Sequence, residues 1–205
     1  MTRSLNPERK AALLDAALKL FAERGVANAL TADIAREAGV ASGTLFLYFP
    51  TKQALVNELA LQLAYEQAQR VAAHLTPQLS ARETFWAVWS ATLGWFLERP
   101  YTFEATQQLR DPVWITPETL AESQRAFAYY YAAIQKGQAE GVLGPYPSEL
   151  IGGMLYQGMV AVMLLLRQTP DPDQQAALIR QGFEMFWGGA AADSPSAAPT
   201  QEEQA

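Results

Sequence analysis

Apolar residues recur every three to four positions along most of the chain, which is the spacing of one face of an α-helix. No segment alternates apolar and polar residues in the way of a half-buried strand. Proline and glycine clusters interrupt the helical pattern. The pattern predicts an all-α protein of about nine helices, at roughly 7–24, 34–38, 44–49, 52–75, 81–98, 101–110, 117–140, 148–168 and 172–187.

The two shortest of these segments form a helix, a tight turn and a second helix. Gly39 directly follows the first segment, which suits a left-handed helix stop. In the second segment Leu45 and Phe49 are four residues apart and point toward a core. The opposite face carries small, hydroxyl-bearing and aromatic side chains, and Lys52 follows it. A major groove and its flanking phosphates accept a face of this kind.

The same residues resemble the DNA-binding signature of the TetR family of transcriptional regulators. The matched positions are Ile34, Ala35, Ala38, Gly39, Val40, Gly43, Thr44, Leu45, Tyr48, Phe49, Lys52 and Leu55. Residues 13–17 and 20–25 match the first helix of the family, so that the resemblance covers roughly residues 8–56. It implies an N-terminal three-helix helix-turn-helix domain, a C-terminal helical ligand-binding and dimerisation domain, and a homodimer on a palindromic operator in double-stranded DNA.

The resemblance also implies which side chains meet DNA. They are Thr31, Ser42, Gly43, Thr44, Phe46, Leu47, Tyr48 and Lys52. Leu30 and Ala41 stand where the family usually places a hydroxyl cap, and the hydroxyl comes one residue later in both helices. We expect Thr44, Tyr48 and Lys52 to anchor phosphates, and Leu47 to meet thymine methyl groups.

The net charge of −6 does not by itself suggest a nucleic-acid partner, but its distribution does. Residues 1–52 carry seven basic and five acidic side chains and are net +2, whereas the remainder is net −8. The positive charge is therefore at the helix-turn-helix end and is modest. We expect few phosphate contacts per subunit.

The helix breaks and the resemblance predict four parts of the chain. These are a helix-turn-helix domain at 1–51, a linking helix at 52–75, a ligand-binding and dimerisation domain at 76–188, and a disordered tail at 189–205 that is rich in alanine, serine, proline and glutamine.

Large aromatic side chains are concentrated after residue 84, in greater number than a small helical core needs. Ordinary core filling is one explanation for each ring. Taken together, they favour a cavity for a small lipophilic effector. The predicted wall consists of Trp89, Phe96, Phe103, Gln107, Trp114, Phe127, Tyr130, Tyr131 and Tyr156.

Residues 150–166 form a run of seventeen residues without a charge. The run is slightly short for a membrane span and contains Tyr156 and Gln157, so we expect a buried helix and no membrane partner. With the amphipathic segment 174–187 it suits a four-helix dimer interface, which the resemblance also implies. The predicted interface residues are Leu155, Met159, Val162, Leu166 and Phe183.

The sequence argues against an enzyme and against a cofactor. It has no cysteine, one histidine (His74), no phosphate-binding loop and no dinucleotide fingerprint, so we expect no metal site and no cofactor. The N-terminus shows no secretory pattern, and a cytoplasmic protein is expected. An all-helical lipid-binding or adaptor protein is the alternative, because the C-terminal part alone fits it.

Overall fold

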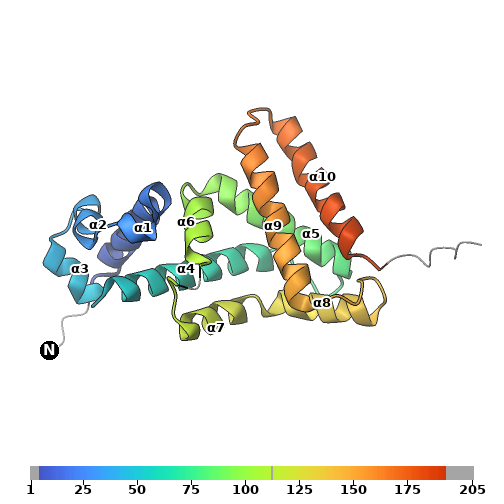
Figure 1. The fold of residues 1–205 in the computed structure, drawn as a ribbon, viewed down its shortest axis with the longest axis horizontal. Helices are drawn as coiled ribbons and strands as arrows, with labels where there is room; N and C mark the ends of the chain where they lie inside the picture. The colour runs from blue at the N-terminus through green and yellow to red at the C-terminus, as the bar shows by residue number, and fades with distance from the viewer. Residues whose placement is uncertain (1–4, 112, 193–205) are drawn as a thin grey trace, which may run out of the picture. The chain divides into compact units, whose positions relative to one another are not determined.

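A computed structural model describes residues 5–111 and 113–192. Within these residues the protein has ten α-helices and no strand longer than an isolated bridge. Their bounds are α1 Pro7–Asn28, α2 Thr31–Glu37, α3 Ser42–Tyr48, α4 Lys52–Ala72, α5 Ala81–Glu98, α6 Thr102–Leu109, α7 Pro117–Ala126, α8 Ala128–Ala139, α9 Ser148–Leu166 and α10 Pro172–Ala190 (Figure 1).

The described residues divide into two compact units. The first combines 5–75 with 91–111 and 113–129, and the second combines 76–90 with 130–192. The first unit thus contains α6 and α7 as well as α1 to α4. This division follows contacts between helices, whereas the predicted domains at 1–51 and 76–188 are a division by function that stays a prediction.

Helix α1 begins and breaks where its sequence predicts. The Asn6 carboxamide caps the helix by accepting hydrogen bonds from the backbone N–H groups of Glu8 (2.7 Å) and Arg9 (3.4 Å), and Pro7 occupies the first turn. Gly25 has a φ of 79° and interrupts the helical backbone, which then continues for one short turn to Asn28. Leucine, alanine and phenylalanine side chains fill the buried face between these two points.

The turn after α2 is a Schellman motif. Gly39 has a φ of 68°, its N–H bonds to the carbonyl of Arg36 at 3.1 Å, and the N–H of Val40 bonds to the carbonyl of Ala35 at 2.9 Å. A residue with a Cβ would be strained at this φ, so glycine fixes the sharp change of direction between α2 and α3.

Helix α4 contacts three other helices of the first unit, α1, α6 and α7. The Thr51 hydroxyl caps it by accepting a hydrogen bond from the N–H of Ala54 at 3.0 Å. Helix α7 packs along α4, and α6 packs against α1 (Figure 1). Arg99, after α5, adds ion pairs to Glu66 on α4 and to Asp15 on α1. Helix α1 is therefore packed onto α6, and α4 onto both α6 and α7, within one unit.

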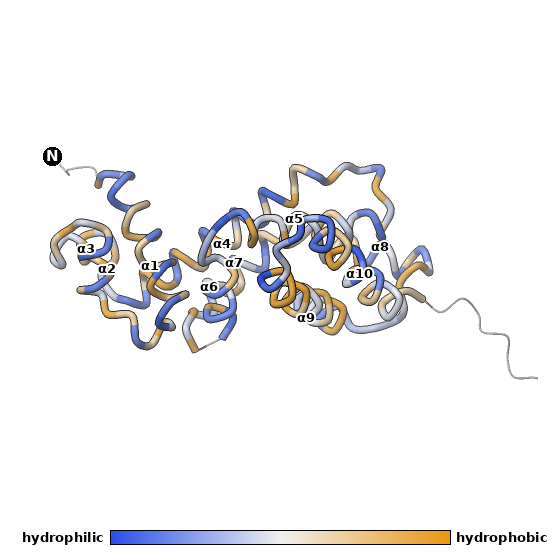
Figure 2. Tube along the Cα trace, turned by 90° about the horizontal axis from the view of Figure 1, so that it is seen from above, coloured by the Kyte–Doolittle hydropathy of each residue, from blue (hydrophilic) through white to orange (hydrophobic). Residues whose placement is uncertain are grey.

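The second unit is held together by aromatic rings. Phe85 lies 5.7 Å from Phe186 and 5.8 Å from Trp187, between ring centroids, and Trp86 lies 5.1 Å from Phe183. The rings come from α5 and α10, so edge and stacked contacts join two helices that are about 100 residues apart in sequence. The hydrophobic residues of α9 extend along most of its length (Figure 2).

Trp89 fits between α9 and α10 because both helices carry a glycine where it lies. A Cβ on Gly158 would come within 3.1 Å of the indole ring, and a Cβ on Gly182 within 2.9 Å. The indole N–H donates to the carbonyl of Ile179 at 2.8 Å, so the only polar atom of this buried ring is satisfied.

Two differences from the predicted elements have local causes. The predicted helix at 117–140 is two helices, because Phe127 departs from helical geometry with a φ of −102° and a ψ of 19°. The predicted disordered tail at 189–205 begins too early: α10 continues to Ala190, and Ala191 forms an antiparallel bridge with Leu143. Residues 193–205 of that predicted tail lie outside the described residues.

Candidate nucleic-acid interface

Helix α3 presents an apolar and hydroxyl-bearing face to solvent. Phe46 is 46% exposed and Leu47 is 68% exposed, whereas Leu45 between α3 and the core is fully buried. Phe49, just after the helix, is also buried. The predicted division of the two faces is therefore observed. Leaving two large apolar side chains in water has a cost in free energy, which a partner surface would remove.

Neither short helix has a side-chain cap. Leu30 and Ala41 occupy the N-cap positions of α2 and α3, and neither side chain can accept a hydrogen bond. Thr31 and Ser42 follow as the first helical residues, and Gly43 and Ser42 are exposed. The shift of one residue seen in the sequence is thus present in the structure, and it leaves both hydroxyls outside the capping position.

Tyr48 ties the end of α3 to the start of α1. Its hydroxyl oxygen accepts a hydrogen bond from the backbone N–H of Asn6 at 3.0 Å. Because a tyrosine hydroxyl both accepts and donates, the O–H of Tyr48 is still able to donate to a phosphate. Thr44 is partly exposed on the same helix.

Lys52 is engaged within the protein. Its ammonium donates to the carbonyl of Ala27 at 3.2 Å, near the C-terminal end of α1, where the helix dipole favours a cation. Burial lowers the pKa of Lys52 from its ordinary value. Lys52 therefore joins α4 to α1, and its predicted phosphate contact stays a prediction.

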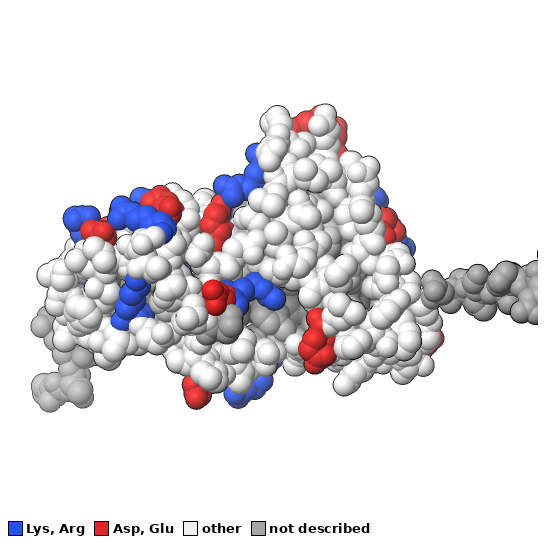
Figure 3. All heavy atoms as spheres, in the orientation of Figure 1, with Lys and Arg blue, Asp and Glu red and all other residues white. Residues whose placement is uncertain are grey.

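Most basic side chains near the N-terminus lie beside a carboxylate. The ion pairs are Lys10 with Glu58, Lys19 with Glu37 at 2.6 Å, Arg24 with Asp33 at 3.0 Å, and Arg36 with Asp33 at 2.5 Å. Basic and acidic groups accordingly adjoin one another over α1 and α2 (Figure 3). The local positive field is modest, as the charge count predicted, and a phosphate would compete with a carboxylate for several of these cations.

The aromatic residues predicted to wall an effector cavity fall in both compact units. Phe96, Phe103, Gln107, Trp114 and Phe127 belong to the first unit, and Trp89, Tyr130, Tyr131 and Tyr156 belong to the second. Within the first unit the Phe96 and Phe103 rings meet edge to face at 5.4 Å. Within the second, the Tyr130 and Tyr131 rings meet in the same way at 5.7 Å.

Trp89, one of the predicted wall residues, lies in the core of the second unit. It has no exposed surface, because the glycines of α9 and α10 admit its ring and Phe183 and Phe186 cover it. It fills the core of the second unit.

Two tyrosine hydroxyls are buried without a hydrogen-bond partner among the described residues. These are the hydroxyls of Tyr129 in the first unit and Tyr130 in the second. Burial raises the pKa of both phenols above the ordinary value, so both are protonated at neutral pH. An unpaired buried hydroxyl is costly, and each would gain a partner from a polar atom brought by another molecule.

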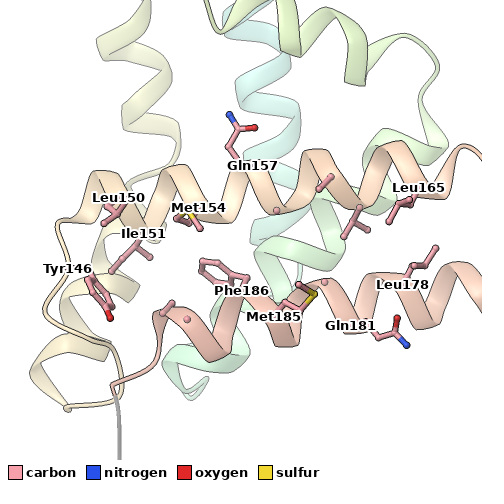
Figure 4. Close-up of a pocket in the computed structure, with 16 residues that line it drawn as sticks. Tyr146, Leu150, Ile151, Met154, Gln157, Leu165, Leu178, Gln181, Met185 and Phe186 are labelled. Carbon is pink, nitrogen blue, oxygen red and sulfur yellow. The ribbon is translucent and has the colours of Figure 1, made fainter.

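An apolar groove of about 850 Å³ runs along α9 and α10. Tyr146 lies at one end of it, and Gln157 and Gln181 point away from the space between the two helices (Figure 4). Met154 is 61% exposed and Met185 is 82% exposed. Almost no charged group covers α9 and α10 on the face drawn in Figure 3.

Four of the five residues predicted for the dimer interface lie outside the groove. Leu155, Met159, Val162, Leu166 and Phe183 are all buried within the single chain, where they pack the core of the second unit. Of the five, only Val162 also lines the groove. The exposed apolar positions of the same two helices belong to a different set: Leu150, Met154, Leu164, Leu165 and Met185.

Helix α9 is the one described helix that is long and apolar enough to cross a membrane, by length and composition only. Among the described residues no group of three or more histidine, cysteine or acidic side chains is placed to hold a metal ion. His74 is exposed at the end of α4.

The N-terminal part of the chain is similar to known regulatory proteins. Residues 13–59 match the family model for bacterial regulatory proteins of the tetR family. The transcriptional regulator LuxR of Vibrio harveyi is 31% identical over 117 residues, which cover 55% of this chain and 57% of LuxR. The chain thus spans about half the length of this curated relative.

Solved structures extend the match over nearly the full chain. A TetR-family structure from Shewanella sp. PV-4 is 30% identical, with a TM-score of 0.81, and the match covers 90% of this chain and 99% of that one. A TetR-family transcription regulator from Marinobacter aquaeolei has the same fold at 22% identity, also with a TM-score of 0.81, over 91% of this chain and 97% of its own. These relatives are transcriptional regulators and not enzymes, and this chain belongs to the TetR family of DNA-binding transcriptional regulators.

Proposed function

We propose that this protein is a cytoplasmic repressor that binds a palindromic operator as a homodimer and is released from DNA by a lipophilic effector. The observation that carries the proposal is the face of α3, where Leu47 is 68% exposed beside a fully buried Leu45. A seven-residue helix that is fixed to the core on one side and apolar on the other is suited to insertion into a major groove.

The side chains on and beside α3 have two roles on DNA. Leu47 and Gly43 meet base edges, where an isobutyl group favours thymine methyl groups and a glycine admits close approach. Thr44, Tyr48 and Lys52 contact phosphates, and Phe46 packs against sugar or a thymine methyl. Thr31 and Ser42, at the first positions of α2 and α3, offer hydroxyls to the backbone at the edge of the groove.

The groove on α9 and α10 takes a second copy of the chain. An exposed apolar surface of this length is uncommon on a monomer, and a two-fold axis brings the same surface of another subunit against it. Met154 and Met185 are long, flexible and highly exposed, so they suit insertion into the partner's groove. Two recognition helices are then presented to two half-sites.

Effector binding is the third part of the proposal. The aromatic residues of the C-terminal part favour a lipophilic molecule. The buried hydroxyl of Tyr130, which has no partner among the described residues, favours one that also carries a hydrogen-bonding group. The dimer has one arrangement of subunits that fits the operator and one that does not. The effector can lower DNA affinity by no more than the ratio of its own affinities for these two arrangements.

The test is a titration of the purified protein against DNA from upstream of its own gene, at several salt concentrations and with a panel of lipophilic compounds. We expect two subunits per site and loss of binding with at least one compound. Specific binding that no compound disturbs contradicts the effector part. Absence of preference over scrambled DNA contradicts the DNA part and favours a hydrophobic-ligand-binding or adaptor protein.

A further inference from the structure

The first two turns of α4 are bonded to the segment that precedes α7. Gln53 donates from its carboxamide to the carbonyl of Trp114 at 2.6 Å and to the side-chain oxygen of Asn57 at 3.1 Å. Gln53 and Asn57 are four residues apart, so they lie on the same face of α4. The recognition helix α3 ends only four residues before α4 begins.

The Asn57 side chain both accepts a hydrogen bond from Thr116 and donates one to it. Its side-chain oxygen accepts from the backbone N–H of Thr116 at 3.2 Å, and its amide group donates to the Thr116 hydroxyl at 3.5 Å. The same hydroxyl caps α7 by accepting from the N–H of Thr119 at 3.3 Å. The cap of α7 and the early turns of α4 therefore share one hydrogen-bond network, which we call the α4–α7 clamp (Gln53, Asn57, Trp114 and Thr116).

Other contacts of α4 connect the clamp to α1 and to α7. Lys52, next to Gln53, bonds to the end of α1 through the carbonyl of Ala27. Farther along α4, the Tyr65 hydroxyl donates to the Glu122 carboxylate on α7. The start of α4 is thus tied to the helix-turn-helix on one side and to the 113–116 segment on the other.

We propose that Gln53 and Asn57 are positioning residues that transmit changes at Trp114 to the DNA-binding helices. The Trp114 side chain belongs to the predicted effector wall, and the Trp114 carbonyl accepts a hydrogen bond from Gln53. One residue therefore connects effector binding to the start of α4. A displacement of the 113–116 segment moves the acceptor of Gln53 and the partner of Asn57 together, and α4 and α3 follow. This inference rests on the proposed function, because it assigns the route of that regulation.

A double-mutant cycle tests the clamp without knowledge of the effector. The variant Trp114→Ala perturbs the segment in place of a ligand, and Gln53→Met removes the donor at nearly constant side-chain length and charge. We expect Trp114→Ala to change the dissociation constant for the upstream DNA fragment about fivefold or more in the otherwise unchanged protein. In the Gln53→Met background the same change should alter it less than about twofold.

The matched control is Gln69→Met, which makes the same substitution at an exposed site near the other end of α4. It should leave the effect of Trp114→Ala intact. Asn57→Leu is the second clamp variant and should suppress the effect as Gln53→Met does. An equal effect of Trp114→Ala in all backgrounds, or no effect of Trp114→Ala in the unchanged protein, overturns the proposal.

Hydrogen–deuterium exchange gives a measurement that needs no DNA. Trp114→Ala should speed amide exchange in α3 and the first turns of α4, and Gln53→Met should abolish that response to Trp114→Ala. If the protein shows no sequence preference but the exchange responses are coupled, the proposed function fails and the clamp stands. If DNA binding is specific and neither exchange nor affinity is coupled, the clamp fails alone.

Discussion

Replacing Met185 by lysine should separate the two subunits without unfolding either. The Met185 side chain is 82% exposed in the single chain and lines the groove between α9 and α10. Fully burying a methionine stabilises by about 1.5–3 kcal/mol. Since four-fifths of that surface is still to be buried and a two-fold dimer contains the residue twice, the pair contributes about 2.5–5 kcal/mol to association.

The expected weakening follows from that figure. Each 1.4 kcal/mol is a factor of ten, so Met185→Lys should raise the dimer dissociation constant about 60-fold or more. The ammonium groups add a further cost if the lysine stem cannot carry them to water. The thermal stability of the single chain should change little, because the side chain makes few contacts there.

Sedimentation equilibrium over a wide range of protein concentrations measures the effect directly. Gln174→Lys is the matched control, because it adds the same charge at an exposed position of α10 outside the groove. It should leave the dissociation constant unchanged. A Met185→Lys protein that dimerises as tightly as the control would show that this face of α10 is not the subunit interface.

Three further results are expected. Gly182→Ala should lower the free energy of unfolding by about 1–3 kcal/mol in urea titrations, since its Cβ would overlap the Val162 side chain and come within 2.9 Å of the Trp89 indole. A change near zero would show that both side chains move aside freely. Tyr130→Phe should raise the free energy of unfolding by about 1 kcal/mol and the midpoint of thermal unfolding by about 2–4 °C, because the buried hydroxyl has no partner among the described residues. A loss of stability would show that the hydroxyl does have a hydrogen-bond partner. On DNA, Leu47→Ala should change base preference at one position of each half-site, whereas Tyr48→Phe should weaken binding to all sequences alike. Equal losses on every sequence for Leu47→Ala would show that Leu47 does not read bases.

The features that sequence predicts well here are decided by a few neighbouring residues. Asn6 and Pro7 start α1, Gly25 breaks it, and Gly39 ends α2, each through backbone geometry that a short stretch of chain determines. The spacing of apolar residues is enough to predict which side of α3 faces the core. Leu45 and Phe49 are four residues apart, so they lie on the same side, and both are buried.

The features that sequence predicts poorly depend on distant neighbours. Helix α9 is apolar on nearly every side, so its periodicity does not tell the core face of Leu155 from the exposed face of Met154. Trp89 is a large aromatic residue of the kind that often lines a cavity. It lies in the core because Gly158 and Gly182, on two other helices, leave room for its ring. The bond between Gln53 and Trp114 joins residues 61 positions apart, and no local pattern indicates it.

Hydroxyl-radical footprinting of the wild-type protein on its own upstream DNA tests the central claim most directly. We expect two protected half-sites related by two-fold symmetry, with centres one helical turn of DNA apart, or a multiple of it, because two copies of α3 are presented by one symmetric dimer. Met185→Lys should lose the paired pattern at concentrations where the control retains it. A single unsymmetrical protected region, or protection that does not differ from that on scrambled DNA, would contradict the account.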